Sequence, residues 1–293
     1  MKDYRIAGHC ISIDFADPTV NDALLPNFAP FKYEGNEEPI LKVNIVSDHS
    51  WEQEAKEIGL FDVGGSNHGV YRNIDGGYRF DVYNSEGHLC SRMQSSADFR
   101  QCFVKVYEGT FVERHFGLNN CMMMAYAFAT ADMDTVLIHS SVIRCDGKGY
   151  LMTAPSGTGK STHTHLWYTT IPGCDLMNDD NPIIRIADGK PVVYGSPWSG
   201  KTPCYINNVY PVGGVVRLRQ AAANSFHRQE GVAAFVALLP GCSVIGQDEA
   251  LRSRLYDTVG RLAQIVTVGI MDCTPHADAA AMCHAALDDI LKQ

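Results

Sequence analysis

The sequence has no Cys-x-x-Cys pair, no dense run of Lys or Arg, and no long apolar segment. Without the paired cysteines, the usual spacing of zinc ribbons and thioredoxin-like redox motifs is excluded. A net charge of −9 without a basic stripe excludes a general nucleic-acid binder, which has to displace counterions from phosphates. No apolar run approaches the ~20 residues that cross a bilayer, and no signal peptide is visible. We therefore expect a cytoplasmic protein whose partners include neither a membrane nor a nucleic acid.

The cysteines are scattered through the chain, and several of the 10 sit among apolar neighbours. A free cysteine behaves as a small buried hydrophobe, so we expect reduced thiols in the core. Apolar residues make up 45% and charged residues 19% of the 293-residue chain, the balance of a globular protein with one large domain or two modest ones.

The secondary-structure signals change in kind near residue 118. Residues 1–117 form a β-rich N-terminal region, in which alternating apolar and polar positions are separated by turn signals. A helix is expected at 118–131, capped by Asn119 or Asn120, and a second domain is expected at 118–293. The strands expected in the N-terminal region include 42–46, 78–83 and 101–107.

The second domain is expected to mix strands and helices. A strand at 136–142 and another at 149–153 flank a turn, and a helix should begin at Ser161. Further strands are expected at 182–186, 191–194, 214–218 and 265–270, and further helices at 231–239, 249–263 and 277–292. The fold class is therefore α/β in the mixed α+β sense.

A glycine-rich segment, 154–161, follows the strand at 149–153 and is called here the phosphate-loop segment. It reads Ala-Pro-Ser-Gly-Thr-Gly-Lys-Ser, which fits the pattern of a small residue, four variable residues and Gly-Lys-Ser. Such glycines let backbone N–H groups curl around phosphate oxygens, and the next helix directs its positive end toward the same anion.

This segment predicts that the protein binds ATP, or another nucleoside triphosphate, with Mg2+. Lys160 supplies a charge to the β- and γ-phosphates, and the Ser161 hydroxyl is a natural magnesium ligand. The residues expected around the nucleotide are Pro155, Ser156, Gly157, Thr158, Gly159, Lys160, Ser161 and Thr162.

A second segment, 195–202, matches the same pattern formally. Two prolines and Trp198 crowd it, and Pro203 follows where a helix should run. We therefore expect a substrate or lid loop there, with a second nucleotide site as the alternative. The residues expected to contact the substrate are Trp198, Lys201 and Arg217, although a solvated strand face would explain Arg217 equally well.

Two adjacent carboxylates, Asp179 and Asp180, follow the phosphate-loop segment within Asn-Asp-Asp-Asn. A kinase needs a carboxylate to hold magnesium and a group to receive the acceptor's proton, and neighbouring aspartates can divide these tasks. An ordinary Asn/Asp turn is the structural alternative. His139 ends a strand, and it gains a role if the fold brings it beside Asp179, where an imidazole orients or tunes that carboxylate.

Together, the phosphate-loop segment, the upstream hairpin with His139, and the downstream Asp179-Asp180-Asn181 resemble the HPr kinase/phosphorylase family. The resemblance is close over residues 135–185 and implies a phosphoenolpyruvate carboxykinase-like nucleotide-binding core. It also implies that Asp179 acts as the base toward the acceptor and that His139 supports it. The metal site that it implies consists of Ser161, Asp180 and Asp179, and the catalytic set of Asp179, His139 and Lys160.

These residues favour an ATP- and Mg2+-dependent kinase that transfers the γ-phosphoryl group to a hydroxyl, expected on Ser or Thr of a peptide or protein. One rival is a small-molecule kinase in which Trp198, Lys201 and Tyr205 line a closed pocket. Another is a non-catalytic ATP-binding regulatory protein, and a phosphorylase running in reverse is a third. A homo-oligomer is compatible with the sequence.

Overall fold

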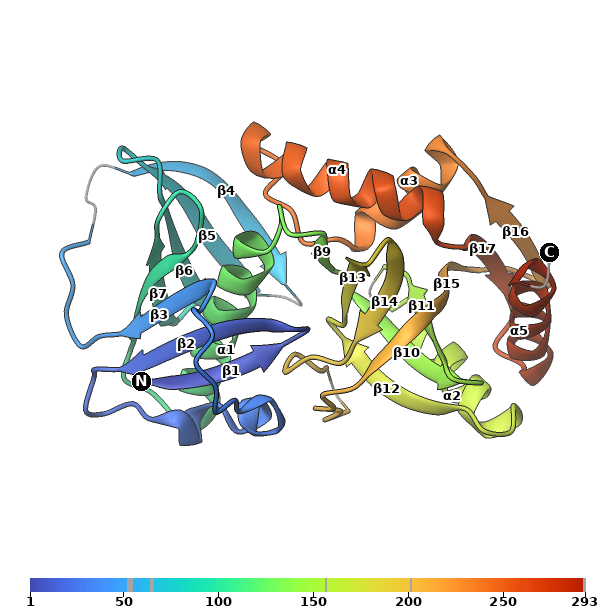
Figure 1. The fold of residues 1–293 in the computed structure, drawn as a ribbon, viewed down its shortest axis with the longest axis horizontal. Coiled ribbons are helices and arrows are strands. Elements are labelled where there is room, and N and C mark those ends of the chain that lie inside the picture. Colours follow the sequence, from blue (N-terminus) through green and yellow to red (C-terminus); the bar gives the residue numbers. More distant parts are fainter. Residues whose placement is uncertain (52–54, 64–65, 156, 201, 292–293) are drawn as a thin grey trace. The chain divides into compact units, whose positions relative to one another are not determined.

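The computed structural model describes residues 1–293 except 52–54, 64–65, 156, 201 and 292–293 (Figure 1). The chain divides into two compact units. The first consists of Met1–Thr130 with Ile245–Leu251, and the second of Ala131–Val244 with Arg252–Gln293. The first unit therefore extends past the boundary expected after residue 117, because the helix that follows residue 110 packs on the sheet of this unit.

An eight-stranded sheet forms most of the first unit, in the order β1-β2-β3-β8-β7-β6-β5-β4. Neighbouring strands are antiparallel except for the parallel pairs β2–β3 and β3–β8. The expected strands at 42–46, 78–83 and 101–107 are confirmed as β3, β6 and β8. The strands are β1 Lys2–Ile6, β2 His9–Phe15, β3 Leu41–Ile45, β4 Ala55–Val63, β5 Ser66–Asn73, β6 Tyr78–Tyr83, β7 Leu89–Ser95 and β8 Gln101–Val106; two short 3-10 helices, Asp22–Leu24 and Pro26–Phe31, follow β2.

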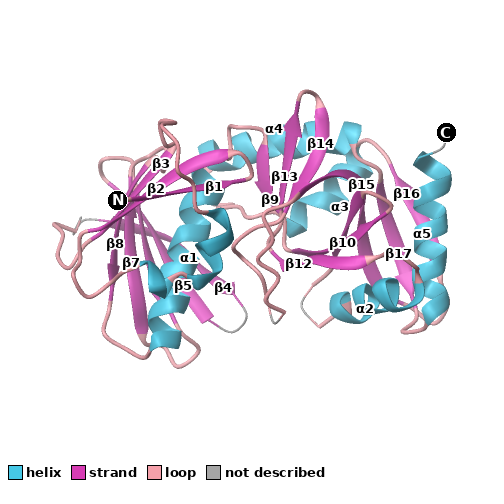
Figure 2. Ribbon diagram, turned by 60° about the horizontal axis from the view of Figure 1, so that its bottom comes forward, coloured by secondary structure: helices cyan, strands magenta, loops and turns pink. Residues whose placement is uncertain are grey.

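Helix α1, Phe111–Ala129, lies against this sheet, as Figure 2 shows. Its start is fixed by a capping box, in which Thr110 Oγ1 accepts from the Glu113 N–H and the Glu113 carboxylate accepts from the Thr110 N–H at 2.9 Å. The helix expected to begin at Asn119 or Asn120 therefore begins two turns earlier, and these asparagines lie in its middle. The sequence reading missed the Thr-x-x-Glu signal at 110–113.

A nine-stranded sheet forms the centre of the second unit. Its main path runs β12-β10-β11-β15-β14-β13-β9, and β17 pairs with both β15 and β16. The pairs β11–β15 and β15–β17 are parallel, and the other pairs are antiparallel. The strands are β9 Thr135–Leu137, β10 Ser140–Cys145, β11 Lys148–Thr153, β12 Asp175–Asp180, β13 Ile183–Ala187, β14 Lys190–Tyr194, β15 Val209–Gln220, β16 Ser225–Gln229 and β17 Val268–Cys273.

Helices cover both faces of this sheet, because its strands alternate apolar side chains between two core clusters. Tyr150 and Met152 of β11 face α2 and α5, whereas Leu151 faces α3 and α4. Figure 1 shows α3 and α4 on one side of these strands and α2 on the other. The helices are α2 Lys160–Thr170, α3 Val232–Leu238, α4 Glu249–Ile265 and α5 Ala277–Leu291, close to the expected ranges.

The protein is thus a mixed α/β structure with large sheets and few helices, as the sequence predicted. No helix in the described part of the chain combines the length and the apolar character that a membrane span requires. The expectation of reduced thiols is wrong for one pair, because Cys145 and Cys174 are joined in a disulfide. The other cysteines are free.

Gly117 sets the distance between α1 and its sheet. A Cβ at this position would lie 2.4 Å from Ser91 Oγ and 2.9 Å from the carbonyl carbon of Cys90, so the helix or the β7 backbone would have to move. We expect Gly117→Ala to lower the free energy of unfolding by about 1–3 kcal/mol, as overpacking does. Urea unfolding followed by circular dichroism measures this change.

The matched control is Gly260→Ala, a second helical glycine whose Cβ would meet no atom within 4 Å. At this position only the helix propensity changes, and we expect the free energy of unfolding to rise by up to about 1 kcal/mol. Equal stability of Gly117→Ala and the wild-type protein would contradict the close approach.

Candidate functional site

The phosphate-loop segment has the expected strand–loop–helix setting. It leaves β11 at Thr153 and enters α2 at Lys160, with Gly159 at the N-cap. Gly157 and Gly159 have φ angles of 77° and 100°, and a Cβ on either would meet no atom within 4 Å. The glycines are therefore required by backbone conformation rather than by lack of room.

At the start of α2, backbone donors lack a partner among the residues that the structure describes. His163 N–H donates to Gly159 O, so the N–H groups of residues 160–162 precede the intrahelical hydrogen bonds. Ser161 and Thr162 are exposed, which leaves their hydroxyls accessible. Ser156, also expected to contact the nucleotide, lies outside the described residues. A helix N-terminus with these properties attracts anions.

Lys160 is held by two acceptors. Its Nζ donates to Ala154 O at 3.0 Å and to His139 Nε2 at 2.9 Å. Burial lowers the pKa of Lys160, and the nearby carboxylates of Asp180 and Asp179 oppose this shift. The ammonium group therefore lies at the start of α2 within the field of both aspartates.

His139 links Lys160 to Asp180. Because Nε2 accepts from Lys160, the ring proton is assigned to Nδ1, which lies 3.0 Å from Asp180 Oδ1. The sequence predicted that His139 would support Asp179, and the structure corrects this assignment. Ser140, the first residue of β10, stands opposite Asp180 of β12. His139, which precedes Ser140, therefore lies within reach of Asp180.

Asp179 has a different partner, Ser141. Ser141 Oγ donates to Asp179 Oδ1 at 2.7 Å, and the two residues face each other in the register of β10 and β12. The sequence reading missed Ser141. No short pattern in the sequence signals this contact, which depends on the register of β10 and β12.

The segment 195–200 supports the strand that carries these carboxylates. The buried Asn178 amide donates to Ser196 Oγ at 3.3 Å and to Trp198 O at 3.2 Å, and Ser196 Oγ donates to Asn181 O at 2.6 Å. A Cβ on Gly200 would lie 2.7 Å from Asp179 O. This backbone contact places the segment directly against the end of β12.

One expectation about this segment is wrong. Trp198 was expected to contact the substrate, but its side chain is 1% exposed and belongs to the core. The alternative of a second nucleotide site loses support, since residues 203–208 after the second match form no helix and lead into β15. Lys201, the other expected substrate residue of this segment, lies outside the described residues.

Arg217 lies one strand away from the phosphate-loop segment. On β15 it pairs with Thr153, the last residue of β11. Arg219, two residues further, forms an ion pair with Asp272 at 2.7 Å, whereas the Arg217 guanidinium has no hydrogen bond or ion pair with another described residue. Arg217 is therefore a cation available to an anion at this edge of the sheet.

A cavity of about 310 Å³ lies beside the start of α2. Thr158, Gly159, Thr162 and His163 line one wall, and residues after β15 and β17, including Ala221 and Thr274, line another. The phosphate-loop segment thus opens on one side toward the sheet edge with Arg217 and on the other toward this cavity.

His163 is buried in the wall of this cavity, with 2% of its surface exposed. Trp167 Nε1–H donates to His163 Nε2 at 3.1 Å, so Nδ1 carries the ring hydrogen. That N–H has no partner among the described residues. A buried unpaired donor costs about 1–3 kcal/mol and favours a bound acceptor.

Comparison with known proteins adds little to this geometry. No protein-family model and no curated protein matches the sequence. Among solved structures, the chain is similar to the Hpr(Ser) kinase/phosphatase from Coxiella burnetii, with 11% identity and a TM-score of 0.34 over 53% of this chain and 91% of that one. A likeness at this level says nothing about function, which has to rest on the residues of the site.

The neutral state of His163 makes the stability of the fold depend on pH. Burial lowers the pKa of His163 from its ordinary value of 6.5 to about 4. Between these values the unfolded chain binds a proton that the folded protein does not, so the free energy of unfolding falls as pH is lowered through this window. The full loss is about 3 kcal/mol.

Urea unfolding at pH 7 and at pH 4.5, on the wild-type protein and on His163→Gln, isolates this contribution because the other titrating groups are common to both. We expect a smaller pH dependence in the variant. Parallel pH profiles would show that burial in the folded protein does not lower the pKa of His163.

Proposed function

We propose that the protein is an ATP- and Mg2+-dependent kinase that transfers the γ-phosphoryl group to a hydroxyl of a peptide or protein. The observation that carries this proposal is the convergence of Lys160, His139, Asp180 and Asp179 at the start of the phosphate-loop helix. Phosphoryl transfer requires positioning and neutralisation of charge rather than a covalent intermediate, and this group of residues supplies both.

The nucleotide would bind across the start of α2. Lys160 would exchange His139 and Ala154 O for oxygens of the β- and γ-phosphates, and the free N–H groups of the first helical turn would contact the same phosphates. Arg217, which has no partner among the described residues, would add a second cation. The nucleoside would enter the cavity beside His163, whose Nδ1–H would donate to an acceptor on the sugar or base.

The residues available to a metal ion suit Mg2+, which prefers hard oxygen ligands. The exposed Ser161 hydroxyl and the Asp180 carboxylate would hold the ion, and Asp179 would lie close enough to share it. When bound, the metal would neutralise charge that develops on the phosphate oxygens. His139 would keep the Asp180 carboxylate oriented while Lys160 contacts the nucleotide.

Asp179 would act as the general base. The Ser141 hydroxyl donates to one carboxylate oxygen, which would leave the second oxygen for the acceptor. As the acceptor's hydroxyl oxygen attacks the γ-phosphorus, the hydroxyl proton would pass to Asp179. The bond between that phosphorus and the β–γ bridging oxygen would break, and ADP would leave.

Asp179→Asn tests the base. The amide keeps the size and the Ser141 contact of the carboxylate but cannot take a proton, so we expect transfer to fall by about 10²–10⁴-fold. ATP affinity should change only slightly. Transfer from γ-labelled ATP to pooled peptides and a cell extract measures the first quantity, and calorimetric titration the second.

Asp175→Asn is the matched control, because this aspartate lies at the other end of β12 and binds Arg144 instead. If the Asp179→Asn variant transfers phosphate as well as the wild-type protein, Asp179 is not the base. Label that reaches only metabolites would indicate a small-molecule kinase. ATP binding without any transfer would indicate the regulatory alternative.

Lys160→Ala tests the nucleotide site separately from the chemistry. Loss of the ammonium group removes the charge aimed at the β- and γ-phosphates, and we expect ATP affinity to fall at least about tenfold, or roughly 1.4 kcal/mol. Lys148→Ala, at the opposite end of β11, should bind ATP like the wild-type protein. Equal affinities of the two variants would contradict this placement of the phosphates.

A further inference from the structure

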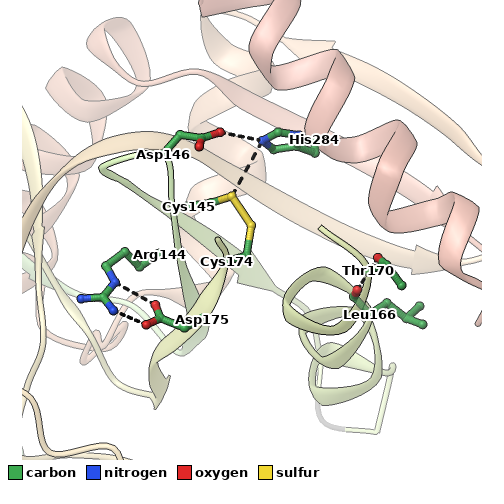
Figure 3. Close-up of a disulfide and its surroundings, with 8 residues drawn as sticks. All are labelled: Arg144, Cys145, Asp146, Leu166, Thr170, Cys174, Asp175 and His284. Carbon is green, nitrogen blue, oxygen red and sulfur yellow. Dashed lines mark hydrogen bonds and ion pairs between the residues drawn. A yellow bond between two sulfur atoms is a disulfide. The ribbon is translucent and has the colours of Figure 1, made fainter. Parts of the chain in front are cut away.

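A second group of reactive side chains lies in the second unit, at the end of its sheet that is remote from the phosphate-loop segment. Cys145 ends β10, and Asp146 follows it in the turn to β11. Cys174 lies between α2 and β12, and His284 lies on α5. Figure 3 shows the four side chains pointing toward one another from three separate parts of the chain.

The ligand-forming atoms of Cys145, Asp146 and His284 all lie within 4.8 Å of one another. His284 Nε2 lies 4.0 Å from Cys145 Sγ and 3.7 Å from Asp146 Oδ2, and Cys174 Sγ is bonded to Cys145 Sγ. Around a tetrahedral zinc ion, sulfur, nitrogen and oxygen ligands lie roughly 3.3–3.8 Å from one another. Three of the four ligand atoms are therefore near that arrangement, and separation of the two sulfurs would free Cys174 Sγ to complete it.

The surroundings orient the imidazole. The rings of Trp167 and Tyr150 pack edge-on against His284, with centroids 5.3 and 6.0 Å away. The cysteines are buried, at 1% and 9% exposure, whereas the Asp146 side chain is 66% exposed. A buried pair of sulfurs with an oriented imidazole and an accessible carboxylate matches a metal site with an entry path better than it matches a plain cross-link.

We propose that the reduced protein binds Zn2+ through Cys145, Cys174 and His284, with Asp146 as the fourth ligand. Two thiolates, an imidazole and a carboxylate form a soft, tetrahedral ligand set that suits zinc rather than magnesium. The disulfide and the zinc site are then two states of the same residues. This inference does not depend on the proposed kinase activity.

The exchange between the two states balances in electrons and protons. A dithiol reductant is oxidised to its own disulfide, and the Cys145–Cys174 bond is converted to two thiols. Zinc binding then releases one proton from each thiol. A diamide oxidant reverses the process by taking up two electrons and two protons, and the re-formed disulfide expels the metal ion.

Zinc content tests the proposal on the full-length chain. The protein is reduced with a dithiol, incubated with Zn2+, desalted and analysed for metal. We expect about one zinc ion per wild-type chain and none in Cys174→Ser or His284→Gln, since each variant loses a protein ligand. Asp146→Asn replaces a charged oxygen ligand by a neutral one and should lower the zinc affinity at least about tenfold. Cys10→Ala, which removes a free buried cysteine of the first unit, is the control and should retain the ion.

Two further measurements use the wild-type chain and do not require a variant to fold. Diamide should release the bound zinc, and Co2+ in its place should show a sulfur-to-metal charge-transfer absorption that diamide abolishes. Reduced wild-type protein that emerges without zinc would overturn the proposal. So would zinc retained at the wild-type level by folded Cys174→Ser, or bound zinc that diamide leaves in place.

Discussion

The register of β10 decides the geometry of the candidate site, because this strand pairs with β11 on one side and with β12 on the other. Ser140 stands opposite Thr153, the last residue before the phosphate-loop segment, and also opposite Asp180. A slip of one residue in either pairing would turn alternate side chains to the other face of the sheet. Lys160, His139 and both aspartates would then lie apart, although every residue would remain in the sequence.

Polar contacts between β12 and residues 195–200 also hold the candidate site in place. Asn178, Ser196 and the carbonyls of Asn181 and Trp198 form a buried network in which each side-chain donor has an acceptor. A fully paired network in a low-dielectric interior is rigid, and an unpaired member would be costly. Asp179 and Asp180 therefore lie on a strand that this network holds in place, while their side chains remain partly accessible.

Local features of the site could be predicted from the sequence, because glycines with positive φ, Lys160 and the following helix are determined within a few residues. The positions of β3, β6, β8 and the C-terminal helices followed from periodicity for the same reason. Contacts between distant residues could not be predicted. The partner of His139, the role of Ser141, the burial of Trp198 and the cross-link of Cys174 all depend on strand register and packing, which no short pattern encodes.

The hydrogen bonds of Lys160 have a consequence for selectivity. Its ammonium group already has an imidazole nitrogen and a carbonyl oxygen as acceptors, and two carboxylates lie nearby. An incoming anion has to attract the ammonium group more strongly than these groups do before Lys160 exchanges its hydrogen-bond acceptors. In the proposed function, a polyphosphate would meet this condition and a singly charged anion would not, so the site would discriminate by charge density before any contact with a sugar or base is made.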